Sequence, residues 1–200
     1  MKERPSLCGA GFFYARRGGM LAPLSNTPKG AMLMTVNTKE APRRGVRFES
    51  FEDLAADLDR IATASQAGTL TVTGNWTAGQ VLEHCNILFK GALDGFPGMA
   101  PLPVRILVKL FFKKKALSGA PLKPGFQLGK GTAWLLPGDD TSVDQGLALL
   151  RGSVERVLNG NERFTHASPA FGELTHEEWT VLQLGHCSMH LSFIDLGDAA

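Results

Sequence analysis

The chain has 200 residues, of which 44% are hydrophobic, and a formal net charge of +2 at pH 7. This length and hydrophobic content suit one domain with a substantial core. The balanced charge and the 8% aromatic content argue against nucleic acid as a partner, because they provide no strongly basic, base-stacking surface. Three widely spaced cysteines do not make a disulfide framework and predict a reduced, cytoplasmic protein. The sequence contains no apolar run of about 20 residues that could span a bilayer.

The first part of the chain differs in composition from the rest. Residues 1–44 are rich in Gly, Pro and basic residues and show no apolar periodicity, so we expect a disordered tail. An alternative is that translation begins inside this stretch, with Met34 as the favoured start. The folded domain is predicted to span residues 45–196.

Helical spacing of apolar residues begins at Ser50, a typical N-cap residue, and predicts a first helix. A second helix is predicted from the capping-box pattern at residues 77–80 to about Leu93. A third long helix is expected after Ser142, where apolar residues recur at intervals of four and three. The capping-box pattern at residues 175–178 opens a last helix, predicted to run to about Ile194. These four amphipathic segments predict an all-α protein.

The region between the second and third long helices is irregular. Residues 104–117 predict a short basic amphipathic helix, which we expect to pack on the other helices with its lysines in solvent; binding to an anionic membrane is the less favoured alternative. Residues 118–140 contain many Gly and Pro residues and predict an extended connection. The segment 69–74 is the single strand candidate and is isolated. We therefore expect a four-helix bundle with a long crossover and a short extra helix.

Two histidines on the last helix are candidate metal ligands. His186 and His190 are four residues apart, so they lie on nearly the same helix face and can reach one ion. Such a pair alone is more often a pair of hydrogen-bonded core residues. His84 strengthens the metal hypothesis, because it lies on the apolar side of another predicted helix and a bundle could bring it to the other two. Three buried imidazoles without partners are unfavourable, whereas one divalent ion would satisfy all of them.

Two segments resemble those of a known superfamily. NWTAGQVLEH, residues 75–84, and FGELTHEEWTVLQLGHCSMHLSFI, residues 171–194, are similar to signatures of DinB/YfiT-like proteins, in an uncharacterised branch. The resemblance covers about residues 45–194. It implies a four-helix bundle with a long second connection, and a metal triad at His84, His186 and His190. Relatives include thiol-dependent transferases, so a low-molecular-weight thiol is an implied cosubstrate.

The implied chemistry is that of one divalent metal ion with an open coordination position. Zn²⁺ is the default for three imidazoles, with Ni, Mn or Fe as alternatives. Such an ion lowers the pKa of a coordinated thiol or water, which suits thiol S-transfer and hydrolysis equally. Gln80 and His166 are weak catalytic candidates: Gln80 could orient a substrate or only cap its helix, and His166 could be an acid or base or only a surface residue. Cys85 and Cys187 are rotated by about 100° from the neighbouring histidines and are expected to be packing residues.

Two functional hypotheses follow. The first is a metal-dependent transferase or hydrolase that acts on a small-molecule substrate. The second is a non-catalytic metal or small-molecule binding protein, in which the triad is structural or vestigial. The protein could act as a homodimer in either case. Metal content separates both hypotheses from a protein in which the histidines are only core residues.

Overall fold

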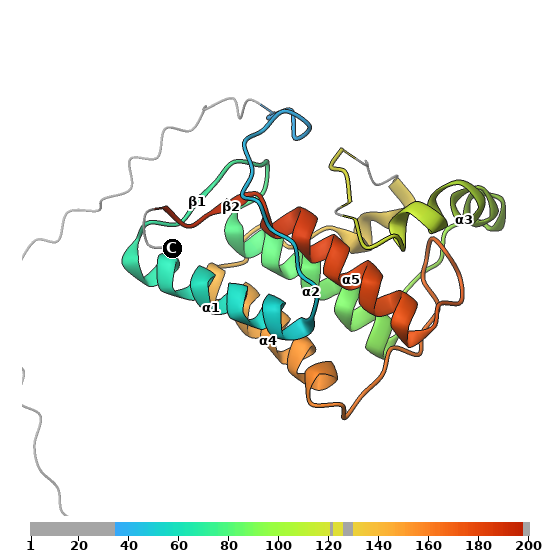
Figure 1. The fold of residues 1–200 in the computed structure, drawn as a ribbon. Helices are drawn as coiled ribbons and strands as arrows, with labels where there is room; N and C mark the ends of the chain where they lie inside the picture. Colours follow the sequence, from blue (N-terminus) through green and yellow to red (C-terminus); the bar gives the residue numbers. More distant parts are fainter. Residues whose placement is uncertain (1–34, 121, 126–129, 198–200) are drawn as a thin grey trace, which may run out of the picture. The chain divides into compact units, whose positions relative to one another are not determined.

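The computed structural model describes residues 35–120, 122–125 and 130–197. The predictions for residues 1–34, including the choice of Met34 as a start, lie outside the described residues. The described chain is mostly helical (Figure 1), as the sequence predicted. Its elements are α1 (Phe51–Ala67), β1 (Thr71–Val72), α2 (Ala78–Asp94), α3 (Leu102–Ala116), a 3₁₀ helix η1 (Lys130–Leu135), α4 (Val143–Leu158), α5 (His176–Leu191) and β2 (Ile194–Asp195). None of the helices in these ranges is long and apolar enough to cross a membrane.

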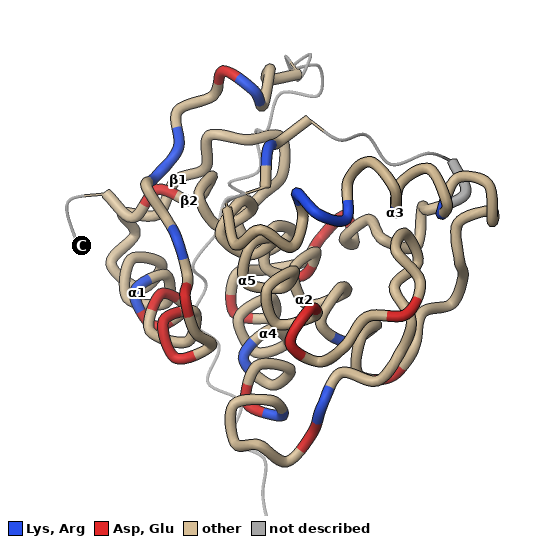
Figure 2. Tube along the Cα trace, turned by 45° about the vertical axis from the view of Figure 1, so that its right-hand side comes forward, with Lys and Arg blue, Asp and Glu red and all other residues tan. Residues whose placement is uncertain are grey.

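Each of the four helices α1, α2, α4 and α5 begins at a residue whose side chain caps the helix. At Ser50, Thr77, Ser142 and Thr175 the hydroxyl accepts a hydrogen bond from the backbone N–H three residues later, and the side chain there accepts from the cap backbone in return. These capping boxes satisfy donors that the first turn of a helix would otherwise leave unpaired. The predicted starts of the helices are therefore confirmed. Acidic residues also gather along α1 (Figure 2), at its first turn and beyond.

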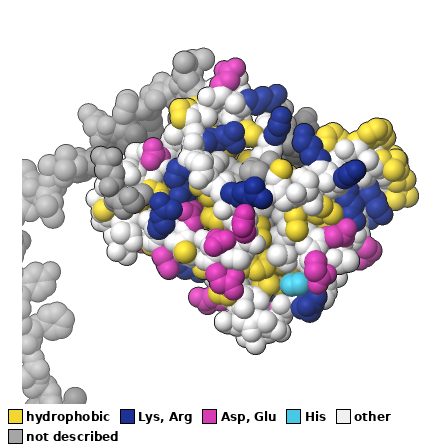
Figure 3. All heavy atoms as spheres, viewed as in Figure 1, with side chains coloured by type: hydrophobic (Ala, Val, Ile, Leu, Met, Phe, Trp, Pro, Cys, Tyr) yellow, Lys and Arg dark blue, Asp and Glu magenta, His cyan; other side chains and the backbone are white. Residues whose placement is uncertain are grey.

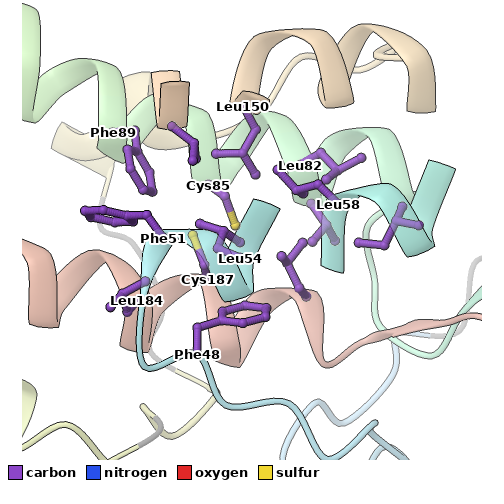
Figure 4. Close-up of a cluster of buried hydrophobic side chains, with 14 of the residues drawn as sticks. Phe48, Phe51, Leu54, Leu58, Leu82, Cys85, Phe89, Leu150, Leu184 and Cys187 are labelled. Carbon is purple, nitrogen blue, oxygen red and sulfur yellow. The ribbon is translucent and has the colours of Figure 1, made fainter. Parts of the chain in front are cut away.

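Helices α1, α2, α4 and α5 share one hydrophobic core (Figure 4). The side chains of α2 meet those of α4 in ascending order, from Gly79 against Ser142 to Asp94 against Arg156, so these two helices run parallel. Helix α5 runs antiparallel to α2, because its later residues meet the earlier residues of α2. Parallel neighbours require a long connection, and the chain between α2 and α4 contains α3 and η1.

Two glycines allow α2 and α4 to approach closely. A Cβ atom at Gly79 would lie 2.0 Å from the carbonyl oxygen of Thr141, and one at Gly146 would lie 2.7 Å from Cβ of Leu82. Such distances exclude any side chain without a shift of the helices. Further along the same interface, the Ser153 hydroxyl donates a 2.6 Å hydrogen bond to Asn86. The glycines thus determine how deeply α2 sits in the core.

Residues 35–44 were assigned to the tail from sequence, and in the structure they run along the folded domain. Arg44 forms a bidentate ion pair with Asp57 of α1, at 2.7 and 2.8 Å. Its guanidinium also donates to the carbonyl oxygens of Ile194 and Leu191. This arginine therefore links the segment before α1 to the end of α5.

Two expectations about the strands and the last helix are wrong. Helix α5 ends at Leu191, and residues 194–195 form a strand that the sequence analysis assigned to the helix. The strand β2 pairs antiparallel with β1, with Thr71 opposite Asp195 and Val72 opposite Ile194. Segment 69–74 is therefore not isolated. The two strands satisfy each other's backbone groups, which neither segment could do alone.

The expectation that residues 104–117 pack with only their lysines in solvent is also wrong. Helix α3 buries a single side chain, that of Ala116, and exposes most of its large apolar residues. The connection from Gly95 to Pro101 carries two prolines, which prevent α2 from continuing and direct α3 away from the shared core. Residues 118–140, expected to be extended, include the short helix η1.

Candidate metal centre

The structure brings His84, His186 and His190 together between α2 and α5. Their ring centroids lie 4.4 to 5.0 Å apart, and their candidate ligand nitrogens all lie within 4.8 Å of one another. His84 faces α5 from the second turn of α2, and the other two come from consecutive turns of α5. The antiparallel packing of the two helices is what places one histidine opposite a pair spaced by four residues.

His84 is held in one orientation by the backbone before α4. Its Nδ1 lies 2.8 Å from the carbonyl oxygen of Leu135. Because a carbonyl oxygen only accepts, the neutral ring must carry its proton on Nδ1, which leaves a lone pair on Nε2. Burial lowers the pKa of His84, and the hydrogen bond to Leu135 offsets part of this effect. Histidines that bind metals commonly donate the N–H of the other ring nitrogen to a carbonyl oxygen in the same way.

The two histidines of α5 are also held neutral. Burial lowers the pKa of His186 well below its ordinary value, and the neighbouring His84 lowers it further. The pKa of His190 is lowered in the same way by burial, and then by His186 and His84. Neutral imidazoles have the lone pairs that metal coordination requires. Among the described residues, nothing forms a hydrogen bond with Nδ1 of His186, although this atom is buried.

Trp76 forms one wall of the cluster. Its ring stacks on that of His190, with 5.7 Å between centroids and an angle of 18° between the planes. It also lies 4.7 Å from the ring of His84, at an angle of 52°. The residue precedes α2 and remains partly exposed. Trp76 lies far from the last helix in the sequence, so no local pattern indicates this contact.

The donor set fits a single divalent ion. Two nitrogens bound tetrahedrally at about 2.1 Å from one ion lie about 3.4 Å apart. The observed nitrogens lie within 4.8 Å of one another, so the two rings of a pair need to move together by at most about 1.4 Å to reach that spacing. Three neutral imidazoles, one buried and two half-buried, also leave hydrogen-bonding capacity that an ion would use, because Nδ1 of His186 is buried and has no partner among the described residues. The three histidines are therefore a group that could hold a metal ion.

The two buried cysteines lie closer to the site than their sequence positions suggested. Cys85 and Cys187 are fully buried in the shared core, where their sulfur atoms point toward each other between α2 and α5 (Figure 4). Their sulfurs and a ring nitrogen of His186 lie within 4.8 Å of one another, so this is a second group able to hold a metal. Burial raises the pKa of the Cys187 thiol well above its ordinary value, and Cys85 adds to the effect. A protonated Cys187 thiol and a buried Cys85 in an apolar core are consistent with the packing role expected from sequence.

The other candidate residues do not join the triad. The side chain of Gln80 completes the cap of α2 and donates to the carbonyl oxygens of Gly138 and Asp139, at 3.1 and 3.4 Å. His166 lies beside Gly95 at the far end of α2, which is about 16 Å along the helix from His84 at a rise of 1.5 Å per residue. Glu83 accepts hydrogen bonds from Gly138 and Thr141. Gln80 and Glu83 therefore hold the loop before α4, whereas His166 lies at the other end of α2.

The fold and the site define a mostly helical protein with a cluster of histidines and cysteines able to hold a metal ion. Residues 43–196 match the model of the family described as "Protein of unknown function (DUF1569)", and the chain belongs to this family. The match begins at the segment that contains Arg44 and ends after β2. Searches of the curated proteins and of the solved structures gave no match.

Proposed function

We propose that the protein binds one divalent metal ion through His84, His186 and His190. The observation that carries the proposal is the meeting of three neutral imidazoles, one of which is already oriented by a carbonyl oxygen. Zn²⁺ is the first candidate, because imidazole nitrogens suit it and three ligands leave a fourth position open. The parallel α2 and α4, the long connection between them, and the two segments noted in the sequence support a DinB/YfiT-like bundle.

The activity that this site supports best is that of a metal-dependent thiol S-transferase or hydrolase acting on a small molecule. A divalent ion there lowers the pKa of a thiol or water that it coordinates, which is the chemistry that both reactions share. The chain supplies the orientation: the Leu135 carbonyl oxygen accepts a hydrogen bond from Nδ1–H of His84, and Trp76 covers one side of the histidines. A low-molecular-weight thiol is the proposed cosubstrate for S-transfer.

A second candidate function is metal or small-molecule binding without catalysis. The observation in its favour is that Gln80 and Glu83 use their polar atoms to hold the loop before α4, and that His166 lies at the other end of α2. A proton-transferring side chain is therefore not provided by these three residues. A measurement of turnover by the metal-loaded protein distinguishes the two functions, because metal binding is common to both and only the first requires turnover.

Metal analysis of the purified full chain tests the proposal. We expect close to one equivalent of divalent metal in the wild type, and a loss of at least tenfold in His186→Ala or His84→Ala. His166→Ala is the matched control, because this histidine is exposed and distant from the cluster; it is expected to retain the metal. Equal metal content in all variants would refute the proposed ligands. A screen of metal-loaded protein with electrophiles and several thiols then separates catalysis from binding.

A further inference from the structure

Helix α3 exposes a continuous apolar surface. Leu110 and Phe111 are each 71% exposed, and Leu102, Val104, Ile106, Leu107 and Phe112 are exposed as well. These seven residues, here called the α3 apolar surface, lie within one helix of 15 residues. In Figure 3, hydrophobic side chains gather over α3 at the right-hand edge of the view, with Lys and Arg side chains beside them. A patch of this kind commonly marks an interaction site.

The same part of the chain is basic. Residues 95–138 contain seven Lys and Arg residues and no Asp or Glu, although the whole chain carries nearly equal numbers of each charge. Lys113 forms a 2.8 Å ion pair with Glu178 of α5. Lys114 and Lys115 are exposed and form no ion pair within the described ranges.

Apolar and basic side chains share the outward face of α3. Leu107, Leu110, Phe111 and Lys114 are separated by three, one and three residues, so they lie on one side of the helix. The stem of Lys114 can cover Phe111 while its ammonium group extends beyond the apolar layer. Lys109 and Lys115 lie on the two flanks of this face. An apolar strip bordered by lysines is the arrangement of helices that lie in the interface of an anionic membrane.

We propose that α3 docks the protein on an anionic lipid surface, with the α3 apolar surface inserted at the level of the head groups and Lys109, Lys114 and Lys115 bound to lipid phosphates. The helix lies at the periphery of the domain and is too short to span a bilayer, so the association is peripheral. The apolar residues extend around most of the helix, and a fluid interface accommodates them without a complementary groove.

A second copy of the chain fits this surface less well. Most homodimers are two-fold symmetric, so the same face meets itself. Symmetric docking through α3 would bring the lysines of one copy near those of the other, without acidic residues in the same segment to balance them. Anionic phosphates provide the opposite charge. The membrane proposal is independent of the metal proposal, because α3 contributes none of the three histidines.

Sedimentation of the full chain with lipid vesicles tests the proposal. We expect binding to vesicles that contain 30% anionic phosphatidylglycerol, at least tenfold weaker binding to neutral phosphatidylcholine vesicles, and a decrease of at least tenfold between 50 and 500 mM NaCl. The variant Lys109→Gln/Lys114→Gln/Lys115→Gln should bind about a hundredfold more weakly, since each lysine near an anionic surface contributes roughly fivefold. The variant Leu107→Gln/Leu110→Gln/Phe111→Gln should lose binding to a similar degree.

The matched control changes an exposed leucine and an exposed lysine elsewhere. Leu149→Gln/Lys90→Gln alters α4 and α2 at the surface and is expected to bind as the wild type does. All the replaced side chains are exposed. The unfolding temperature of each variant is measured to check that it folds. Failure of the wild type to bind anionic vesicles, or equal binding by the α3 variants, would overturn the proposal. Salt-insensitive binding would do the same, and so would a dimer that depends on Leu110 and forms without lipid.

Discussion

Replacing Gly146 with alanine tests the packing that positions α2, and with it His84. A Cβ atom there would lie 2.7 Å from Cβ of Leu82 and 2.8 Å from the carbonyl oxygen of Gly79. Ordinary contact requires the helices to separate by about 0.7 Å. Overpacking against backbone costs up to about 3 kcal/mol, and the gain in helix propensity returns about 1 kcal/mol. We therefore expect Gly146→Ala to lower the free energy of unfolding by about 2 kcal/mol.

Gly152 provides the matched control on the same helix. A Cβ atom at Gly152 meets nothing within 4 Å, so Gly152→Ala should gain helix propensity alone, about 1 kcal/mol. Thermal unfolding followed by circular dichroism should then show a Tm about 4–8 °C lower for Gly146→Ala, and about 2–4 °C higher for Gly152→Ala. If both variants were stabilised equally, the close approach of α2 and α4 would be refuted.

Three further predictions concern stability and the buried thiols. Asp57→Asn removes the charge that pairs with Arg44, and should lower the free energy of unfolding measured in urea by about 3 kcal/mol; a change below about 0.5 kcal/mol would contradict a buried ion pair. The hydrogen bond from Arg156 lowers the pKa of Asp94, so this pair stabilises the fold above the unfolded-state pKa near 3.9 and loses its effect as the pH falls through the lower folded-state pKa. Arg156→Met should therefore unfold at a higher pH than the wild type in an acid titration, and equal midpoints would argue against the pair. The two cysteines of the core should resist iodoacetamide in the native protein and react after unfolding, as read by peptide mass spectrometry; rapid native labelling would contradict their burial.

The helices could be predicted because their signals are local. The hydroxyl residues at 50, 77, 142 and 175 each precede an apolar pattern, and a cap needs only residues within one turn. The shared face of His186 and His190 likewise follows from helix geometry alone. The meeting of these residues with His84 was a hypothesis about packing, and the structure brings the three rings together.

The features that could not be predicted depend on contacts between distant segments. The end of α5 at Leu191 is determined by the pairing of residues 194–195 with β1, more than a hundred residues earlier. The orientation of His84 depends on the carbonyl of Leu135, whose position no local pattern specifies. The outward position of α3 could not be predicted either. Periodicity identifies an amphipathic helix, but the path of the connecting loop decides which of its faces meets the core.

X-ray absorption spectroscopy of the zinc-loaded full chain tests the proposed metal centre most directly. The account predicts a first shell of nitrogen or oxygen at about 2.0–2.1 Å, with the outer-shell scattering of about three imidazole rings. Loss of one imidazole contribution in His190→Ala would identify that ligand. A shell of sulfur at about 2.3 Å would place the ion at Cys85 and Cys187 and contradict the account, as would a spectrum without imidazole scattering.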